Sequence, residues 1–117
     1  MMIQRGAIFN INFSPQRGHE QEGLRPAIVI QADLYCPLST ILVIPTSTHA
    51  HKEIDFHVPV TIQGTRTYAL IEQLTAVDKV QRIKNESCLG MLTIQEMEKI
   101  DDMLRIFMGL DPELSMG

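Results

Sequence analysis

The chain has 117 residues, of which 44% are hydrophobic, so it is long enough for one domain with a modest core, and we expect a single domain over residues 1–117. Its formal net charge of −4 and pI near 5.5 exclude a protein that holds nucleic acid by bulk positive charge, and any such binding needs a local cluster. No apolar run reaches the roughly 18 residues of a membrane span and residues 1–5 lack the apolar centre of a signal peptide, so we expect a cytoplasmic protein without membrane contact.

The first half of the chain predicts short strands. Apolar and polar residues alternate toward the end of 7–13, as in a half-buried strand, and Ser14-Pro15 ends it. Two apolar runs, Arg25–Gln31 and Thr40–Pro45, are typical of strands buried on both faces.

The second half predicts further strands and one helix. Residues 54–58 alternate as an edge strand does, and Pro59 suits an edge position. Gly64 marks a turn before a strand over 67–71, and 74–77 continues as another strand or its extension. The stretch from 83 to 92 favours no element clearly.

The closing helix is predicted by its ends and its apolar stripe. Thr93 and Glu96 form a capping box, and Gly109 marks the C-terminal end. The stripe has three- and four-residue spacing and predicts a buried face, although a methionine-rich stripe also suits a protein-binding surface; it comprises Met97, Ile100, Met103, Leu104 and Phe107. Many short strands and one helix predict an α+β or small-barrel domain.

The loop before the second strand carries the most informative residues. Gly18 to Pro26 places an imidazole, carboxylates and an amide between glycines and delivers Arg25 at the start of an apolar strand. A strand can hold a guanidinium at a fixed height and angle, as bidentate recognition of a phosphate requires. The alternative is a surface arginine paired with Glu20 or Glu22.

Several motifs, in the order in which they follow one another along the chain, resemble those of the MazF/PemK family, the toxins of bacterial toxin–antitoxin pairs. The similarity runs from about Arg5 to Leu110 and rests on these motifs: Arg5-Gly6, Ser14-Pro15, Gly18-His19-Glu20-Gln21-Glu22-Gly23, Arg25-Pro26, Pro45-Thr46-Ser47, Glu72-Gln73 and Val77-Asp78. The resemblance implies an α+β fold with a compact SH3-like barrel and a C-terminal helix. It further implies a homodimer, metal-independent cleavage of single-stranded mRNA without a cofactor, and inhibition by a cognate antitoxin.

Cleavage through the ribose 2′-hydroxyl needs a base, a group that stabilises the phosphorane and an acid. Arg25 suits the second role, because its guanidinium stays charged and donates two parallel hydrogen bonds. The resemblance implies a base at Glu72 and a proton carrier or RNA contact at His19, although a lone loop histidine is often only solvated. Glu20, Gln21 and Arg17 are further candidates for RNA contact in the same loop.

Ser47 aligns with a threonine of the family that can bind a phosphate oxygen. Three hydroxyls in a row, Thr46, Ser47 and Thr48, leave the register open by one residue, and a hydroxyl-rich turn after a strand is the alternative. Gln73 either contacts a base edge or ties two strands together.

Two positions depart from the family pattern. Leu70 stands where some relatives carry an arginine proposed as the acid, and Thr75 stands where many carry a further arginine. A catalytically inactive protein, or a gyrase-poison-like binding module on the same barrel, is therefore the alternative function, although the gyrase poisons use a C-terminal tryptophan that this chain lacks. A weaker third possibility is a structural dimer whose helix and methionines recruit a partner.

A metal site is not expected. His49 and His51 can share one strand face, but the further ligands that zinc requires have no recognisable spacing. Cys36 and Cys88 lie far apart in sequence, and we expect buried thiols rather than a disulfide.

Overall fold

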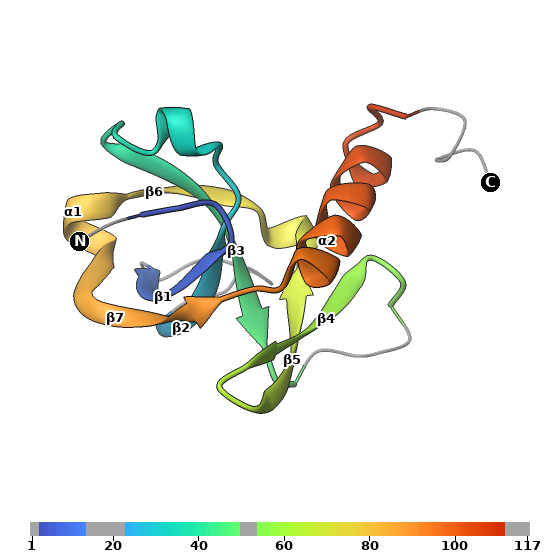
Figure 1. The fold of residues 1–117 in the computed structure, drawn as a ribbon, viewed down its shortest axis with the longest axis horizontal. Coiled ribbons are helices and arrows are strands. Elements are labelled where there is room, and N and C mark those ends of the chain that lie inside the picture. The colour runs from blue at the N-terminus through green and yellow to red at the C-terminus, as the bar shows by residue number, and fades with distance from the viewer. Residues whose placement is uncertain (1–2, 14–22, 50–53, 112–117) are drawn as a thin grey trace.

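The computed structural model describes residues 3–13, 23–49 and 54–111, with the backbone alone at 84–87. Antiparallel strands carry most of this fold (Figure 1). In the described part of the chain the strands are β1 (Ala7–Phe13), β2 (Gly23–Val29), β3 (Thr40–Ser47), β4 (His57–Ile62), β5 (Thr65–Leu70), β6 (Thr75–Asp78) and β7 (Ile83–Met91). The helical elements are the short turns η1 (Asp33–Tyr35) and η2 (Ile71–Gln73), and the helices α1 (Lys79–Arg82) and α2 (Ile94–Phe107).

The sheet curls because β3 changes partners along its length. The strand order is β4-β5-β3-β2-β1-β7, and β6 also pairs with β3. Residues 43–45 of β3 pair with β2 and residues 40–43 pair with β6, whereas Thr46 and Ser47 pair with β5. The result is a curled antiparallel half-barrel with a C-terminal helix, which confirms the predicted α+β class.

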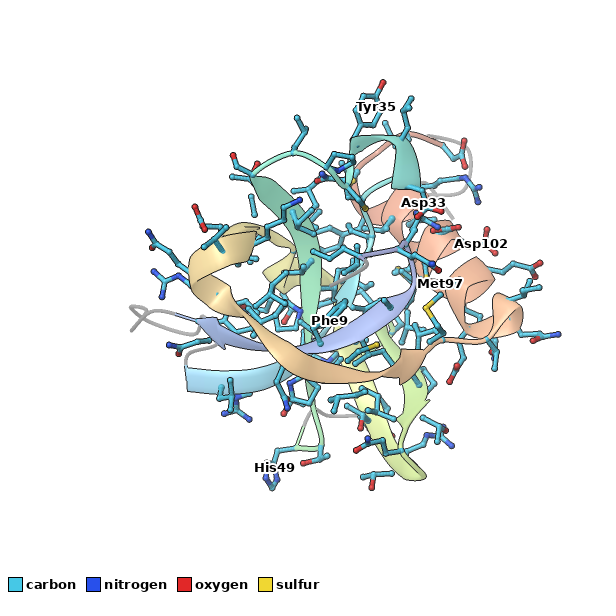
Figure 2. All side chains as sticks on the ribbon, turned by 60° about the vertical axis from the view of Figure 1, so that its left-hand side comes forward. Phe9, Asp33, Tyr35, His49, Met97 and Asp102 are labelled. Atoms are coloured by element: carbon cyan, nitrogen blue, oxygen red, sulfur yellow. The ribbon has the colours of Figure 1, made fainter. Side chains whose placement is uncertain are left out.

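The core forms on both faces of the sheet, since successive side chains of a strand point to opposite sides. From β1, Phe9, Ile11 and Phe13 enter one cluster of buried side chains, and Ile8 enters the other. Figure 2 shows Phe9 within the molecule, while Tyr35 and His49 project from opposite ends of it. Two buried clusters explain why β2 and β3 have near-continuous apolar sequences.

Helix α2 covers the second cluster and lies beside β4 and η2 (Figure 1). Ile100 is fully buried there, and three partly buried side chains pack around it: Met97, Met103 and Leu104. Both bonds of the predicted capping box are present, and Gly109 has a φ of +72° just beyond the helix. The expected stripe is wrong at Phe107, which is 48% exposed, and its ring lies against that of Phe56.

The outer edge of β4 is closed against further strand pairing. Alternate residues of an edge strand turn their N–H groups outward. The His57 N–H donates to the Ile54 carbonyl over 3.0 Å, Pro59 has no N–H, and the Thr61 N–H donates to Glu96 Oε2 over 2.7 Å. Glu96 therefore caps α2 and also protects the edge of the sheet, and the predicted edge position of Pro59 is confirmed.

Several predicted boundaries differ from the structure. The strand expected over 54–58 is confirmed only at 57–58, because β4 begins at His57 and the residues before it form a turn. Strand β2 begins at Gly23 and ends at Val29, two residues before the predicted Arg25–Gln31 at each end. Strand β7 fills the stretch for which the sequence favoured no element.

The two cysteines differ in exposure. Cys36 is buried as predicted, whereas Cys88 is exposed, and both are free thiols. Register shifts in the β1–β7 pairing on both sides of Phe9 interrupt the alternation of β7, and Cys88 pairs with Phe9 between them. No helix in residues 3–13, 23–49 and 54–111 is long and apolar enough to cross a membrane.

Candidate functional site

A cleft of about 390 Å³ lies where β2, β3 and the β4–β5 hairpin meet. Strands β1 and β7 complete its wall. The described residues that line it are Asn10, Leu24, Arg25, Pro26, Thr46, Ser47, Thr48, Ile62, Gln63, Thr65, Thr67 and Leu89. The cleft therefore gathers the predicted arginine and the three predicted hydroxyls in one place.

The strand register brings Arg25 near Ser47. The pairing of β2 with β3 ends at Ala27 and Pro45, two residues away from Arg25 and Ser47, and both of these line the cleft. Thr46, one residue along, donates its hydroxyl to the Pro26 carbonyl over 2.8 Å, which holds the two strands together at this level. Arg25 is also fixed from the other side, because it is paired with Ile11 of β1.

The three consecutive hydroxyls of β3 have different surroundings. Thr46 is only 1% exposed and its hydroxyl donates to a backbone carbonyl. Ser47 is half-buried and its oxygen accepts a hydrogen bond from the His49 N–H over 3.1 Å, so its hydroxyl proton can point toward a ligand. Thr48 is exposed at the end of the strand. Ser47 and Thr48 are thus better placed than Thr46 to meet a ligand.

The described lining of the cleft carries the positive charge that an anion site needs. Among the described residues that line it, Arg25 is the one with a formal charge, and the rest are amides, hydroxyls or apolar groups. A cation within a wall of neutral hydrogen-bonding groups favours a ligand with a phosphate or another anionic group.

The remaining loop candidates cannot be placed in this cleft. His19, Glu20, Gln21 and Arg17 lie outside the described residues. The chain re-enters the described part at Gly23, two residues before Arg25.

Glu72 lies in η2, outside the cleft, and is bound to a histidine. The Nε2 atom of His57 lies 2.9 and 3.0 Å from the two carboxylate oxygens of Glu72. The Nδ1 atom of His57 is buried and has no hydrogen-bond partner in the described chain. In the neutral imidazole the N–H is therefore on Nε2, where it can donate to Glu72. Thr67 of β5 lines the cleft, and the three residues that follow it, as far as Leu70, span about 10 Å along the strand. Glu72 comes after Leu70, in η2, beyond this end of the strand.

The other predicted positions also lie apart from the cleft lining. Gln73 is the last residue of η2. Leu70, where some relatives carry an arginine, is a buried apolar residue at the end of β5, and Thr75 is exposed at the start of β6.

Sequence reasoning missed several residues of the cleft. Asn10 and Gln63 bring amides to it from β1 and from the β4–β5 turn, and Thr65 and Thr67 bring hydroxyls from β5. The turn at Gly64 was a visible signal, but which side chains face the cleft depends on strand pairings that a single sequence does not display.

A family model described as the PemK-like, MazF-like toxin of type II toxin–antitoxin systems matches residues 4–108. The chain belongs to this toxin family. A protein of Mycobacterium tuberculosis (strain H37Rv) that is described as a candidate toxin is 32% identical over 110 residues, which cover 93% of this chain and 100% of that protein.

Solved structures of MazF proteins have the same fold. The crystal structure of MazF from Deinococcus radiodurans superposes with a TM-score of 0.80 at 24% identity and covers 93% of this chain and 98% of that chain. A MazE–MazF complex from the same organism gives a TM-score of 0.77 at 24% identity, covering 95% and 99%. An endoribonuclease in complex with its cognate antitoxin, from a mycobacterial species, gives 0.68 at 15% identity, covering 92% and 94%. These likenesses confirm the predicted MazF-like fold.

Proposed function

We propose that this chain is the endoribonuclease toxin of a type II toxin–antitoxin system. It cleaves single-stranded RNA without a metal ion, by attack of a ribose 2′-hydroxyl on the adjacent phosphorus. The observation that carries the proposal is the cleft where Arg25, Ser47 and Thr48 meet and where the described lining has a single cation and no carboxylate. The family and the neighbouring endoribonuclease structures support it.

Arg25 is assigned to the phosphate. As the 2′-oxygen bonds to phosphorus, negative charge grows on the two non-bridging oxygens, and a guanidinium can donate one hydrogen bond to each. Placement within β2, between β1 and β3, limits the motion of its backbone, so the group is oriented before the substrate arrives.

Ser47 is assigned as a second phosphate ligand. Its oxygen is held by the His49 N–H, which leaves the hydroxyl proton for a phosphate oxygen. Thr48 extends the same row of hydroxyls along the strand end. Thr46 is assigned a structural role, because its hydroxyl donates to the Pro26 carbonyl and so joins β3 to β2.

Proton transfer is assigned to His19, which precedes β2 in the sequence, with Glu20, Gln21 and Arg17 as further RNA contacts. An imidazole can take the proton of the 2′-hydroxyl and then return it to the departing 5′-oxygen. Glu72 is not needed for this scheme, because its carboxylate is bound to His57 and it does not line the cleft.

Two partners belong to the proposal. MazF of D. radiodurans and the mycobacterial endoribonuclease are found in complexes with antitoxins, and we infer that a cognate antitoxin likewise inhibits this toxin. We also propose a homodimer, as the resemblance implies.

Incubation of the purified chain with single-stranded RNA in excess EDTA tests the proposal. Attack by the 2′-hydroxyl requires products with a 2′,3′-cyclic phosphate and a 5′-hydroxyl, so new 5′ ends should be ligated only after treatment with a kinase. Intact RNA in every sequence context, or cleavage that EDTA abolishes, would contradict the proposal and favour an inactive binding module.

A further inference from the structure

The proposed chemistry leaves part of the cleft lining unused, which we call its second half: Gln63, Ile62 and Leu89. We propose that this half is a subsite for one unpaired nucleobase next to the scissile phosphate, and that Gln63 selects the base. This inference rests on the proposed function.

The turn holds Gln63 in a defined position. Ile62 and Thr65 are paired across the hairpin, so Gln63 and Gly64 alone form the connection, and both have positive φ angles of 48° and 81°. Two central residues with positive φ are the requirement of a tight type I′ turn, which favours asparagine or glycine. Gln63 is the one residue other than glycine with positive φ in the described chain.

The identity of residue 63 is therefore not explained by the turn. Asparagine or glycine would form the same turn with less backbone strain, whereas glutamine adds a longer side chain that ends in a carboxamide. Gln63 lines the cleft and is exposed to solvent there, so its carboxamide is accessible to a ligand. A strained backbone at a cleft is consistent with a side chain retained for binding.

The chemistry of this half fits a base better than a second phosphate. A carboxamide offers an acceptor and a donor side by side and carries no charge, which matches the paired acceptor and donor on the edge of a base. Leu89, which is partly buried, supplies apolar surface against which the flat face of an unstacked base can pack, and Ile62, which is only 6% exposed, adds little to it. Since both halves belong to one cleft of about 390 Å³, a nucleotide with its phosphate at Arg25 can direct its base toward Gln63.

Two substitutions at residue 63 distinguish the role of its carboxamide from its role in the turn. Gln63→Gly removes the carboxamide and suits the positive φ, so loss of folding does not confuse the result. Gln63→Asn also suits the turn and retains the amide on a side chain shorter by one methylene. Gln95→Ala is the matched control, because Gln95 is an exposed amide in the first turn of α2 and does not line the cleft.

The experiment maps the cut sites of each variant on a long single-stranded RNA of mixed sequence, in EDTA, by sequencing the new 5′ ends. We expect the wild-type protein and Gln95→Ala to share one base preference at a nucleotide beside the cut. Gln63→Gly should lose about tenfold in discrimination at that nucleotide, measured as the ratio of cuts at the preferred base to cuts at the other bases, with Gln63→Asn between them.

Three results would overturn the inference. An unchanged preference in Gln63→Gly would show that another group selects the base, while the proposed nuclease function would stand. Loss of all cleavage by a folded Gln63→Gly would place Gln63 in the chemistry rather than in base selection. Absence of cleavage by the wild-type protein would instead remove the proposed function itself.

Discussion

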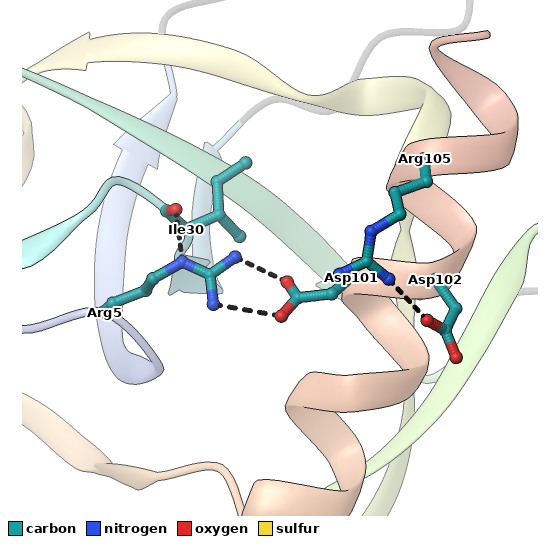
Figure 3. Close-up of polar contacts among 5 residues, drawn as sticks. All are labelled: Arg5, Ile30, Asp101, Asp102 and Arg105. Carbon is teal, nitrogen blue, oxygen red and sulfur yellow. Dashed lines mark hydrogen bonds and ion pairs between the residues drawn. The ribbon is translucent and has the colours of Figure 1, made fainter. Parts of the chain in front are cut away.

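Arg5 and Asp101 form a paired ionic contact that joins the start of β1 to α2, as Figure 3 shows. Arg5 Nη2 lies 2.5 Å from Asp101 Oδ1 and Nη1 lies 3.3 Å from Oδ2, while Nε donates to the Ile30 carbonyl over 2.8 Å. The Arg5 backbone N–H also donates to Asp33 over 2.7 Å. The Arg5-Gly6 motif thus has a structural role in connecting the helix to the half-barrel.

Replacement of Arg5 by alanine should lower the free energy of unfolding by about 1 to 3 kcal/mol, because a half-buried carbonyl and carboxylate lose their donors. Arg105→Ala is the control. Arg105 Nη1 lies 2.6 Å from Asp102 Oδ1, but the two side chains are 50% and 68% exposed. The free energy of unfolding should therefore fall by less than about 0.5 kcal/mol. Urea unfolding of both variants measures the difference, and equal losses would contradict the role given to Arg5.

Glu96 should make the protein less stable in acid. Burial alone would raise the pKa of its carboxyl, but hydrogen bonds from Thr93 and Thr61, together with the Lys99 charge, lower that pKa below its usual value. A carboxyl whose folded pKa is lowered stabilises the protein above its unfolded pKa of about 4.3 and loses this contribution as the pH falls through the folded pKa.

Glu96→Gln tests this dependence. Glutamine retains an acceptor for the helix cap but presents a donor to the Thr61 N–H, so unfolding at pH 7 should cost about 1 kcal/mol less than in the wild-type protein. Below the folded pKa of Glu96 the two proteins should differ little, since the protonated carboxyl resembles the amide. Glu98→Gln, at an exposed position of the same helix, is the control. A difference in free energy of unfolding between wild type and Glu96→Gln that does not change with pH would contradict the prediction.

The two thiols should react at very different rates. Cys88 is exposed on β7, whereas Cys36 is 4% exposed, and its burial, with the negative charge of Asp33, raises the pKa of its thiol despite the opposing charge of Lys79. An aromatic disulfide reagent at pH 8 should therefore modify one thiol per chain quickly and the second only on unfolding. Cys88→Ser should remove the fast phase. Two fast thiols would contradict the burial of Cys36.

Glu72→Gln distinguishes a structural carboxylate from a catalytic base. Because Glu72 is bound to His57 and lies outside the cleft lining, we expect RNA cleavage within about threefold of wild type. The pair joins η2 to β4, so the free energy of unfolding should fall by about 1 kcal/mol. A loss of cleavage as large as that of an Arg25 variant, with the fold retained, would return Glu72 to the catalytic machinery.

Local signals predicted much of the fold. The Thr93–Glu96 box and the apolar stripe around Ile100 located α2, because a capping box and helical spacing need only neighbouring residues. The first strand was predicted within its observed bounds, Ala7–Phe13. The error at 54–58 has a tertiary cause, since Phe56 belongs to a turn and contacts Phe107 of α2 rather than a strand partner.

The site was only partly accessible from sequence. Arg25 and Ser47 were found through motifs that are contiguous in the chain, and the structure brings both to one cleft. Asn10 and Gln63 come from β1 and the β4–β5 turn, and only the pairing of these strands with their neighbours places them there. The His57–Glu72 pair depends in the same way on the pairing of His57 with Leu70.

The rate of RNA cleavage by Arg25→Ala and Arg25→Lys, measured in EDTA under single-turnover conditions beside wild type, tests the central claim most directly. Alanine should reduce the rate by about 100- to 1,000-fold, and lysine should restore little, because an ammonium cannot donate two parallel hydrogen bonds to the phosphate. Unfolding curves like that of wild type would show that the fold is kept. Cleavage by a folded Arg25→Ala at the wild-type rate would contradict the account.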